Sequence, residues 1–551
     1  MYKNFKEHSK IKCSVRHESL VEGGLLGNIT NVVGSILGNT SSINQLLNFG
    51  SFSSEPPVSQ SNFIRYPGVS IAKSGYAQMK DQILLQMQLF WDSEYPANKI
   101  ELANMNQPIE WKRPFEIIQN PLMFSSGISR HDINQGKLGD CWLLAAIASL
   151  VTYPNLLKRV VPLDQSFNSG DYGGIFRFYI WYYGQWLEII VDDLLPTANG
   201  KLIYMSSKDL NEFWSPLLEK AYSKIFGSYK NLKGGITSEA MIDFTGGITE
   251  KIVLKKNIAL SNNMSAIYQL FCMILHAYTS QALMSCSKEG GMEFKDNSGL
   301  VSRHAYSVTA VCVVNTNGYG QMNLIRLRNP WGNETEWRGP WSDGSYEWVC
   351  VPPQELQRLQ MVRNADGEFW MAFNDFVNHF DKIEICHIDP QSFEDLAQIR
   401  NKEYITKKSW EPKVFYGDWK AGLNAGGSQN HNTYYTNPQL EFTIREADDG
   451  TANGTGTVII SLMQRNMRMF NRELHPIGYS VYQKPHGAGI GQNFRNLIEV
   501  ASSGTYVDTR EISGRHQLFL GTYIIIPSTY KPNEESQFLI RIFNSTKFRT
   551  T

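Results

Sequence analysis

Residues 135–150 read QGKLGDCWLLAAIASL, and this stretch decides what the rest of the chain is expected to build. A glycine-containing loop ends at Asp140, and the apolar, alanine-rich run after it predicts a helix that begins at Cys141. A cysteine at a helix N-terminus faces the positive end of the helix dipole and free backbone N–H groups, which favour its thiolate form. Because a low-pKa thiolate is what a cysteine nucleophile needs, the segment predicts a nucleophilic Cys141.

Gln135 stands on the same loop as the candidate nucleophile. Its side-chain amide can donate to an oxyanion, with the backbone N–H of Cys141 as the second donor. A cysteine at the head of a buried helix is, however, more often a small core residue. Taken alone, the loop leaves both interpretations of Cys141 open.

A histidine and an asparagine further along the chain complete the pattern. His304 stands in SRHAYSVT (302–309), where a β-rich run begins, and Asn329 stands in RNPWG (328–332). The amide oxygen of Asn329 can accept from the His304 ring and orient it, and Trp331 can shield that bond from water. One histidine before a strand is usually structural, but Cys, His and Asn in this order and rough spacing are typical of a catalytic cysteine with a His–Asn base.

The flanking segments predict a helix-rich part followed by a strand-rich part. Apolar residues at helical spacing in 213–227 predict an amphipathic helix. The alternating stretch 176–193 predicts a β-hairpin that turns at Gly184. Two β-rich runs on either side of 315–318 predict a second hairpin.

The composition is that of a globular chain of 551 residues, enough for roughly three or four domains. Lys and Arg together number 52, as do Asp and Glu, so the net charge is zero and no nucleic-acid partner is expected. Seven cysteines without a CxxC pair indicate neither a disulfide scaffold nor a zinc ribbon. The first residues lack the apolar core of a secretion signal, and no apolar run approaches the length of a membrane span, which predicts a cytoplasmic protein.

The two ends of the chain differ from its middle. Residues 1–80 form a tail rich in Gly, Asn and Ser, interpreted as flexible, with a weak membrane or partner contact through its uncharged apolar residues as the alternative. A linker at 391–409, with a helix-like stretch at 394–404, leads into 410–551. There, short β-rich runs alternate with Gly, Asn and Pro turns, which predicts an antiparallel β-sandwich. The runs are 440–444, 457–464, 477–484, 517–527 and 537–543.

Several further motifs make the chain resemble the calpain family. They are WKRPFEI (111–117), NEFWSPLLEKAY (211–222), DFTGG (243–247), WSDGSYEW (341–348) and DGEFWMAFNDF (366–376), in addition to the segments quoted above. The resemblance is specific over about 89–386 and looser over 405–551, through GDWKAGLNAGG, NPQLEF and QFLIRIF. It implies an α+β, papain-like protease core of two subdomains followed by an all-β, C2-like antiparallel sandwich. The subdomains would be 81–235, with the nucleophile, and 236–390, with His304 and Asn329.

The resemblance also implies a function. The protein would be a calcium-activated intracellular cysteine endopeptidase that cleaves protein substrates through an acyl-enzyme. Its catalytic residues would be Cys141, His304 and Asn329, assisted by Gln135. The alternative is a calcium-responsive scaffold without catalysis that binds membranes or partners, although such a scaffold has no need to keep these four residues.

Two calcium ions in the protease core are implied in the same way, one in each subdomain. The first would take Asp132 and Glu212 with the backbone carbonyls of Ser125 and Gly127. The second would take Glu336, Asp343, Asp366 and Glu368 with the carbonyl of Asn364. These oxygens are the ligands that calcium prefers, although any single Asp or Glu is more often a solvated surface charge. Arg130 and Glu368 match positions that form an ion pair between the subdomains in this family.

The sequence departs from the family pattern in its second half. No complete EF-hand loop occurs, so neither a penta-EF-hand domain nor a small-subunit heterodimer is expected. The acidic loop of the sandwich is short, at 446–449, which makes regulation through it doubtful. Membrane association when calcium rises, through the sandwich or the tail, is the remaining partner prediction, beside protein substrates.

Overall fold

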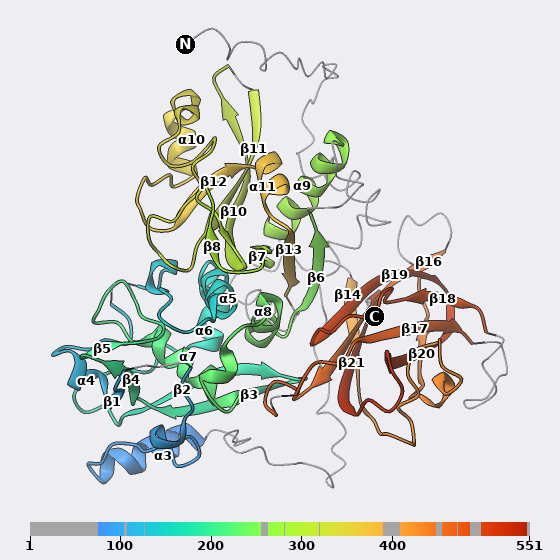
Figure 1. Ribbon diagram of the computed structural model, residues 1–551, viewed down its shortest axis with the longest axis horizontal. Helices are drawn as coiled ribbons and strands as arrows, with labels where there is room; N and C mark the ends of the chain where they lie inside the picture. The colour runs from blue at the N-terminus through green and yellow to red at the C-terminus, as the bar shows by residue number, and fades with distance from the viewer. Residues whose placement is uncertain are drawn as a thin grey trace.

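A computed structural model describes residues 75–547 except 104–106, 126, 255–262, 280, 319, 389–407, 448–453, 471 and 485–496. Most of the predicted tail, most of the linker with its helix-like stretch, and part of the acidic loop lie outside these residues. The described chain forms a helix-rich part, a part built on a six-stranded sheet, and a pair of four-stranded sheets. Figure 1 shows the first below the second, with the paired sheets beside them.

The helix-rich part surrounds one apolar core. Its helices are α3 (Gly75–Leu85), α4 (Pro114–Ile117), α5 (Cys141–Val151), α6 (Pro154–Val160), α7 (Trp214–Ile225) and α8 (Thr237–Thr245). Its strands are β1 (Glu110–Lys112), β4 (Leu195–Ala198) and β5 (Lys201–Leu202) in one sheet, and β2 (Ile175–Tyr182) and β3 (Gln185–Asp192) in a hairpin. The core comes largely from α5, α7 and α8 and from the inner face of the hairpin.

The helices at 141 and 213 and the hairpin at 176–193 are confirmed. In α5, Trp142 to Val151 are all buried, as a run without a polar face requires. The hairpin turns through Tyr183 (φ 45°) and Gly184 (φ 100°), a pair of left-handed residues that suits the twist of the strands. A Cβ on Gly184 would lie 2.3 Å from the Tyr416 hydroxyl of the sandwich, so glycine is required there on both grounds.

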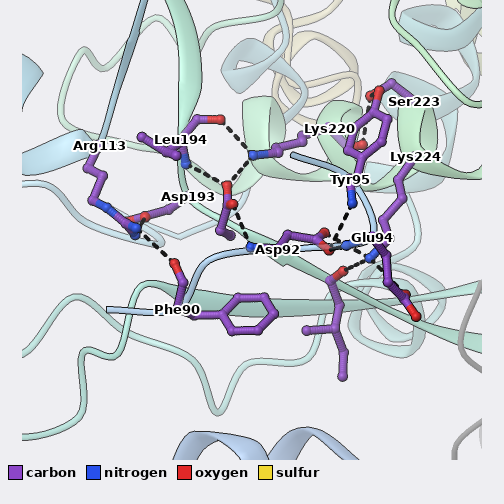
Figure 2. Close-up of polar contacts among 12 residues, drawn as sticks. Phe90, Asp92, Glu94, Tyr95, Arg113, Asp193, Leu194, Lys220, Ser223 and Lys224 are labelled. Carbon is purple, nitrogen blue, oxygen red and sulfur yellow. Dashed lines mark hydrogen bonds and ion pairs between the residues drawn. The ribbon is translucent and has the colours of Figure 1, made fainter. Parts of the chain in front are cut away.

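Buried charges fasten the segment before β1 to the core (Figure 2). Lys224 of α7 pairs with Asp92 at 2.8 Å, and the backbone N–H of Asp92 donates to Asp192 at 2.9 Å. Lys220, one turn earlier on α7, pairs with Asp192. Arg113 pairs with the buried Asp193 and donates to the Phe90 carbonyl, so each buried carboxylate in this network has a cationic partner.

The second part is an antiparallel sheet of order β12-β11-β10-β7-β13-β6. Its strands are β6 (Ile248–Val253), β7 (Leu283–Lys288), β10 (His304–Thr316), β11 (Gly320–Arg328), β12 (Glu368–Ala372) and β13 (Lys382–His387). Around them lie α9 (Met264–Thr279), α10 (Pro353–Arg358), α11 (Phe373–His379) and the short pair β8 (Phe294–Lys295) and β9 (Val301–Ser302). The predicted second hairpin is confirmed as β10 and β11, with Gly318 at φ 100° in its turn.

Helix α5 joins the two parts of the core. The Ser307 hydroxyl of β10 donates to the Ala145 carbonyl of α5 at 2.8 Å. The Met284 N–H of β7 donates to the Ser149 hydroxyl at 3.1 Å. The helix that begins with Cys141 therefore lies directly against the strand that begins with His304.

The C-terminal region consists of two antiparallel sheets that share a core. One sheet has the order β14 (Lys408–Trp419), β21 (Ser536–Lys547), β16 (Thr455–Arg465), β19 (Glu511–Phe519), and the other has β15 (Leu440–Ile444), β20 (Gly521–Thr529), β17 (Ile477–Gln483), β18 (Glu499–Ser502). Inward side chains from both sheets, such as Ile460, Tyr479 and Ile540, form one cluster. The β-sandwich is thus observed, whereas its C2-like character stays a prediction.

The prediction of one strand over 517–527 is wrong. The run is divided between β19 and β20, which belong to different sheets. A continuous apolar run carries no period that reveals where a strand leaves one sheet for the other.

The sandwich is attached to the helix-rich part by arginines. Arg510 pairs with Asp243 of α8 at 2.9 Å, and Arg541 donates to the Gly246 carbonyl at 2.8 Å and the Gly247 carbonyl at 3.0 Å.

The helices of the described residues include none with the length and apolar character that a membrane span needs.

Candidate active site

Cys141 is the first residue of α5, as the sequence predicts. The Asp140 carbonyl accepts from the Leu143 and Leu144 N–H groups at 2.8 and 3.2 Å, which fixes the start of the helix. Cys141 is partly exposed, whereas the helix after it is buried. The position thus combines access to a substrate with the positive end of a helix dipole.

His304 is the first residue of β10 and is almost completely buried. The residue before it, Arg303, has φ 51°, a left-handed conformation that separates β10 from β9. His304 Nε2 lies 2.9 Å from Asn329 Oδ1, the contact that the sequence predicts. The other ring nitrogen, Nδ1, is therefore the one that remains for a nucleophile.

Both polar atoms of the Asn329 side chain form hydrogen bonds. Its Nδ2 donates to the Thr335 carbonyl at 3.0 Å, and its Oδ1 also accepts from the Trp331 N–H at 3.0 Å. The Trp331 ring lies 4.9 Å from the His304 ring, centroid to centroid, as expected of a shield over the His–Asn bond. The Asn329 amide is therefore fixed with its oxygen toward the imidazole.

The surroundings of His304 favour its protonated form. Burial alone would lower the pKa of His304, but Cys141, Glu293 and Asn329 together raise it to about 9. Cys141 is the strongest of these three influences on the pKa of His304. An imidazolium beside a cysteine is the condition for a stable thiolate.

Gln135 connects the nucleophile loop to the histidine side of the site. Its backbone N–H donates to the Pro330 carbonyl, next to Asn329, at 3.1 Å. Its side-chain Nε2 donates to the Leu138 carbonyl at 2.8 Å, within its own loop. One N–H of that amide thus remains for another acceptor.

The predicted first calcium site brings two carboxylates together. Asp132 accepts from the Ser129 N–H and hydroxyl at 2.6 and 2.8 Å, and Glu212 accepts from the Ser125 N–H at 3.0 Å. Burial, followed by the neighbouring Asp132, raises the pKa of Glu212 to about 7. Gly127, the fourth predicted ligand, has φ 102° on the same loop as Ser125.

The predicted second site also gathers carboxylates. Glu336 accepts from the Asp366 and Gly367 N–H groups at 3.0 and 2.7 Å, and Asp343 accepts from the Asn364 N–H at 3.2 Å. Burial, then Glu336 and Asp366, raises the pKa of Asp343 to about 7. A cavity of about 70 Å³ is lined by four of these residues (Asp343, Asn364, Asp366, Glu368) and by basic side chains that include Arg130.

Glu368 has a different neighbourhood from the other predicted ligands. Both its oxygens accept from Arg130, at 2.6 Å each, and Arg326 lies 3.5 Å away. The predicted ion pair between the subdomains is thus present. Among the described residues, no three His, Cys, Asp or Glu side chains are arranged to hold a metal ion.

Comparison with known proteins gives two matches that divide the chain as the fold does. Residues 90–387 match the family described as "Calpain family cysteine protease", and residues 415–543 match "Calpain large subunit, domain III". The chain belongs to the calpain family. Residues 90–387 accordingly correspond to the cysteine protease part of that family.

Three calpains illustrate the similarity. Calpain-B of Drosophila melanogaster is 41% identical over 499 residues, which are 87% of this chain and 52% of the relative. Calpain-A of the same organism is 43% identical over 493 residues, 86% of this chain and 57% of the relative. Calpain-9 of Rattus norvegicus is 42% identical, with 87% and 68% covered. The chain thus spans little more than half the length of the two Drosophila calpains.

One residue at the calpain site escaped the sequence analysis. Glu293 Oε1 lies 3.2 Å from Nδ1 of His304, the ring nitrogen opposite the one bonded to Asn329. Glu293 stands between Met292 and Phe294, just after two glycines, on an irregular segment, so neither periodicity nor a motif could indicate its position.

Proposed function

We propose that this calpain is a calcium-activated cysteine endopeptidase with Cys141, His304 and Asn329 as its catalytic residues. The observation that carries the proposal is the buried His304, which is bonded to Asn329 through Nε2 and opens the strand that packs against the helix headed by Cys141. The subdomain boundaries, the protein substrates and the cytoplasmic location are parts of the same proposal.

In the proposed reaction, the Cys141 thiolate attacks the carbonyl carbon of a peptide bond while His304 is an imidazolium. The His304 Nδ1–H gives its proton to the leaving amine as the C–N bond breaks, and the acyl group stays on the Cys141 sulfur. A water molecule then gives a proton to the neutral His304 and attacks the acyl carbon, which releases the carboxylic product and restores the thiolate.

The oxyanion of each tetrahedral intermediate needs donors that are already in place. The Cys141 N–H is one, because the first turn of a helix leaves its N–H groups without partners in the helix. The free N–H of the Gln135 amide is the other, because the bond to Leu138 holds the amide beside the nucleophile loop.

Removal of the Asn329 amide should slow the reaction without weakening substrate binding. We expect Asn329→Ala to lower kcat roughly a hundredfold with little change in KM, because the His304 ring loses the acceptor that orients it. Steady-state hydrolysis of a fluorogenic peptide measures this effect. Asn317→Ala, in the exposed turn between β10 and β11, is the matched control. Equal kcat for the two variants would contradict the assigned role.

The predicted ligand sets fit calcium in their chemistry. They consist of hard oxygen donors, and the raised pKa values of Glu212 and Asp343 reflect burial and crowded carboxylates that lack enough positive charge. Calcium, when bound, would supply that charge. One ion would be held by Asp132 and Glu212 with the carbonyls of Ser125 and Gly127. The other would be held by the second predicted ligand set, which includes Asp343.

The two calcium regions are connected through short contacts. Arg130 belongs to the same turn as Asp132 and pairs with Glu368, which lines the cavity at the second predicted calcium site. Gln135, a few residues further on, bonds to Pro330 beside Asn329. A change at either calcium region can therefore reach the relative position of Cys141 and His304, which is how we propose that calcium controls activity.

Loss of one carboxylate should raise the calcium requirement. We expect Asp343→Asn to increase the calcium concentration for half-maximal activity about ten- to a hundredfold, because a charged oxygen ligand is lost. The shift of the thermal unfolding midpoint on calcium addition should shrink in parallel, which is a readout independent of activity. Glu334→Gln, exposed near Glu336, is the control. An unchanged requirement in Asp343→Asn would remove this residue from the site.

The test of the function itself is a calcium titration of casein hydrolysis by the purified chain. Activity that rises with calcium supports the proposal, and activity without calcium dependence would keep the protease and reject the calcium switch. A scaffold without catalysis would hydrolyse nothing and would not be labelled at Cys141 by a thiol-reactive peptide epoxide. Contacts with membranes or with a small subunit have no support among the described residues, so neither is part of this proposal.

A further inference from the structure

The imidazole of His304 has an acidic neighbour that the mechanism above does not use. Glu293 Oε1 lies 3.2 Å from Nδ1, the ring nitrogen that is not bonded to Asn329. The His304 side chain is completely buried, whereas that of Glu293 is half-exposed. The carboxylate therefore reaches into the site from its rim.

Glu293 lies on the segment between β7 and β8. Its neighbours Met292 and Phe294 are 71% and 62% exposed, so the segment runs along the surface while the Glu293 carboxylate points inward. The approach of the carboxylate to Nδ1 is an ion-pair contact. The neighbouring His304 is the main reason that the pKa of Glu293 is below its ordinary value.

The charges around the imidazole can be named element by element. Cys141 faces the ring from α5, and Glu293 faces it from the rim. Tyr306, on the same strand, presents its ring edge-on at 5.2 Å, and its hydroxyl oxygen accepts from the Val301 N–H at 2.8 Å. Arg303 lowers the pKa of Glu293 but is not among the main influences on the pKa of His304. Cys141 and the carboxylate of Glu293 are therefore the two acidic residues that act on the imidazole.

We propose that Glu293 is a positioning residue that shares the Nδ1 proton of His304 with Cys141 and so extends the imidazolium–thiolate pair to higher pH. This inference rests on the proposed peptidase function. Each negative acceptor beside Nδ1 stabilises the cation relative to the neutral ring, so loss of Glu293 lowers the pKa of His304. The imidazolium is the form that protonates the leaving amine, and activity on the alkaline side must fall with it.

The first measurement is the pH dependence of kcat/KM for the parent chain, Glu293→Gln and Glu293→Asp. The Glu293→Gln variant keeps a side chain of the same shape without the charge. We expect its alkaline limb to move to lower pH, with about a three- to tenfold loss near pH 9 and little loss near pH 6.5. Glu293→Asp, which keeps the charge on a shorter arm, should recover part of that loss. Glu289→Gln, an exposed glutamate on the same segment, should follow the parent.

The second measurement does not depend on peptidase activity. In chains that carry Cys141→Ser, the titration of His304 is followed by NMR with labelled histidine, and His304→Gln identifies its signal among the 11 histidines. The midpoint should be lower when Glu293→Gln is added. An unchanged midpoint together with an unchanged alkaline limb overturns the inference. A lowered midpoint, together with no hydrolysis by the parent chain that keeps Cys141, would instead keep the Glu293 contact and reject the peptidase.

Discussion

Replacement of Cys141 by serine is expected to abolish peptide hydrolysis, by at least about a thousandfold, while the chain stays folded. A serine hydroxyl lacks the low pKa that lets a thiol form a stable thiolate beside an imidazolium. The substitution removes one partly exposed sulfur and disturbs no buried packing. Hydrolysis of casein and thermal unfolding, measured on the same preparation, give the two required readouts.

The controls for this prediction come from the other partly exposed thiols of the described chain. Cys312 and Cys350 share the exposure of Cys141 but lie away from a helix N-terminus and from His304. Cys312→Ser and Cys350→Ser should retain activity close to that of the parent. Full calcium-dependent hydrolysis by Cys141→Ser would mean that another group is the nucleophile.

The positions of Cys141, His304 and Asn329, which we propose to be catalytic, could be predicted because each carries a local signal. Cys141 follows a glycine loop and opens an apolar run, so both the helix and its first residue are readable from the sequence. His304 opens a β-rich run in the same way. Asn329 precedes Pro330, which has no N–H and cannot continue a strand ladder, so the end of β11 is also marked.

Contacts between distant segments could not be predicted in this way. Glu293 reaches His304 from an irregular segment, and its inward orientation depends on tertiary packing. The division of 517–527 between two sheets depends on which strands pair, which one apolar run does not encode. The proposed calcium regions could be predicted in part. The carboxylates could be named from the sequence, but the pairing of Glu368 with two arginines could not, because those arginines come from two other elements.

The sandwich contacts the protease core close to the nucleophile. Arg468 lies over the ring of Trp142, the residue after Cys141, at 4.9 Å. It also donates to the Asn231 and Gly234 carbonyls at 2.9 and 2.8 Å. A planar guanidinium can stack and donate at once, which a lysine cannot do in the same geometry. The attachment of the sandwich therefore bears on the helix that presents Cys141.

The strongest single contact of this attachment should be the pair of Asp243 and Arg510. Both side chains are buried, and Arg510 also donates to the Glu239 carbonyl at 2.7 Å. We expect Asp243→Ala to destabilise the chain by about 3–5 kcal/mol, because it leaves the Arg510 charge buried without its partner. Thermal unfolding of the purified chain should show a midpoint lowered by several degrees.

Two further variants separate the loss of the pair from the loss of packing. Asp418→Ala removes the carboxylate of an exposed pair with Lys420 and should change stability by less than about 1 kcal/mol. The double variant Asp243→Leu with Arg510→Met replaces both charges by apolar groups and should recover most of the stability lost in Asp243→Ala. If the double variant were less stable than Asp243→Ala, the pair would not be the main source of the effect. Recovery would show that the sandwich is held to α8 mainly by the packing of buried side chains. The charges would then determine which surfaces pair rather than how tightly they bind.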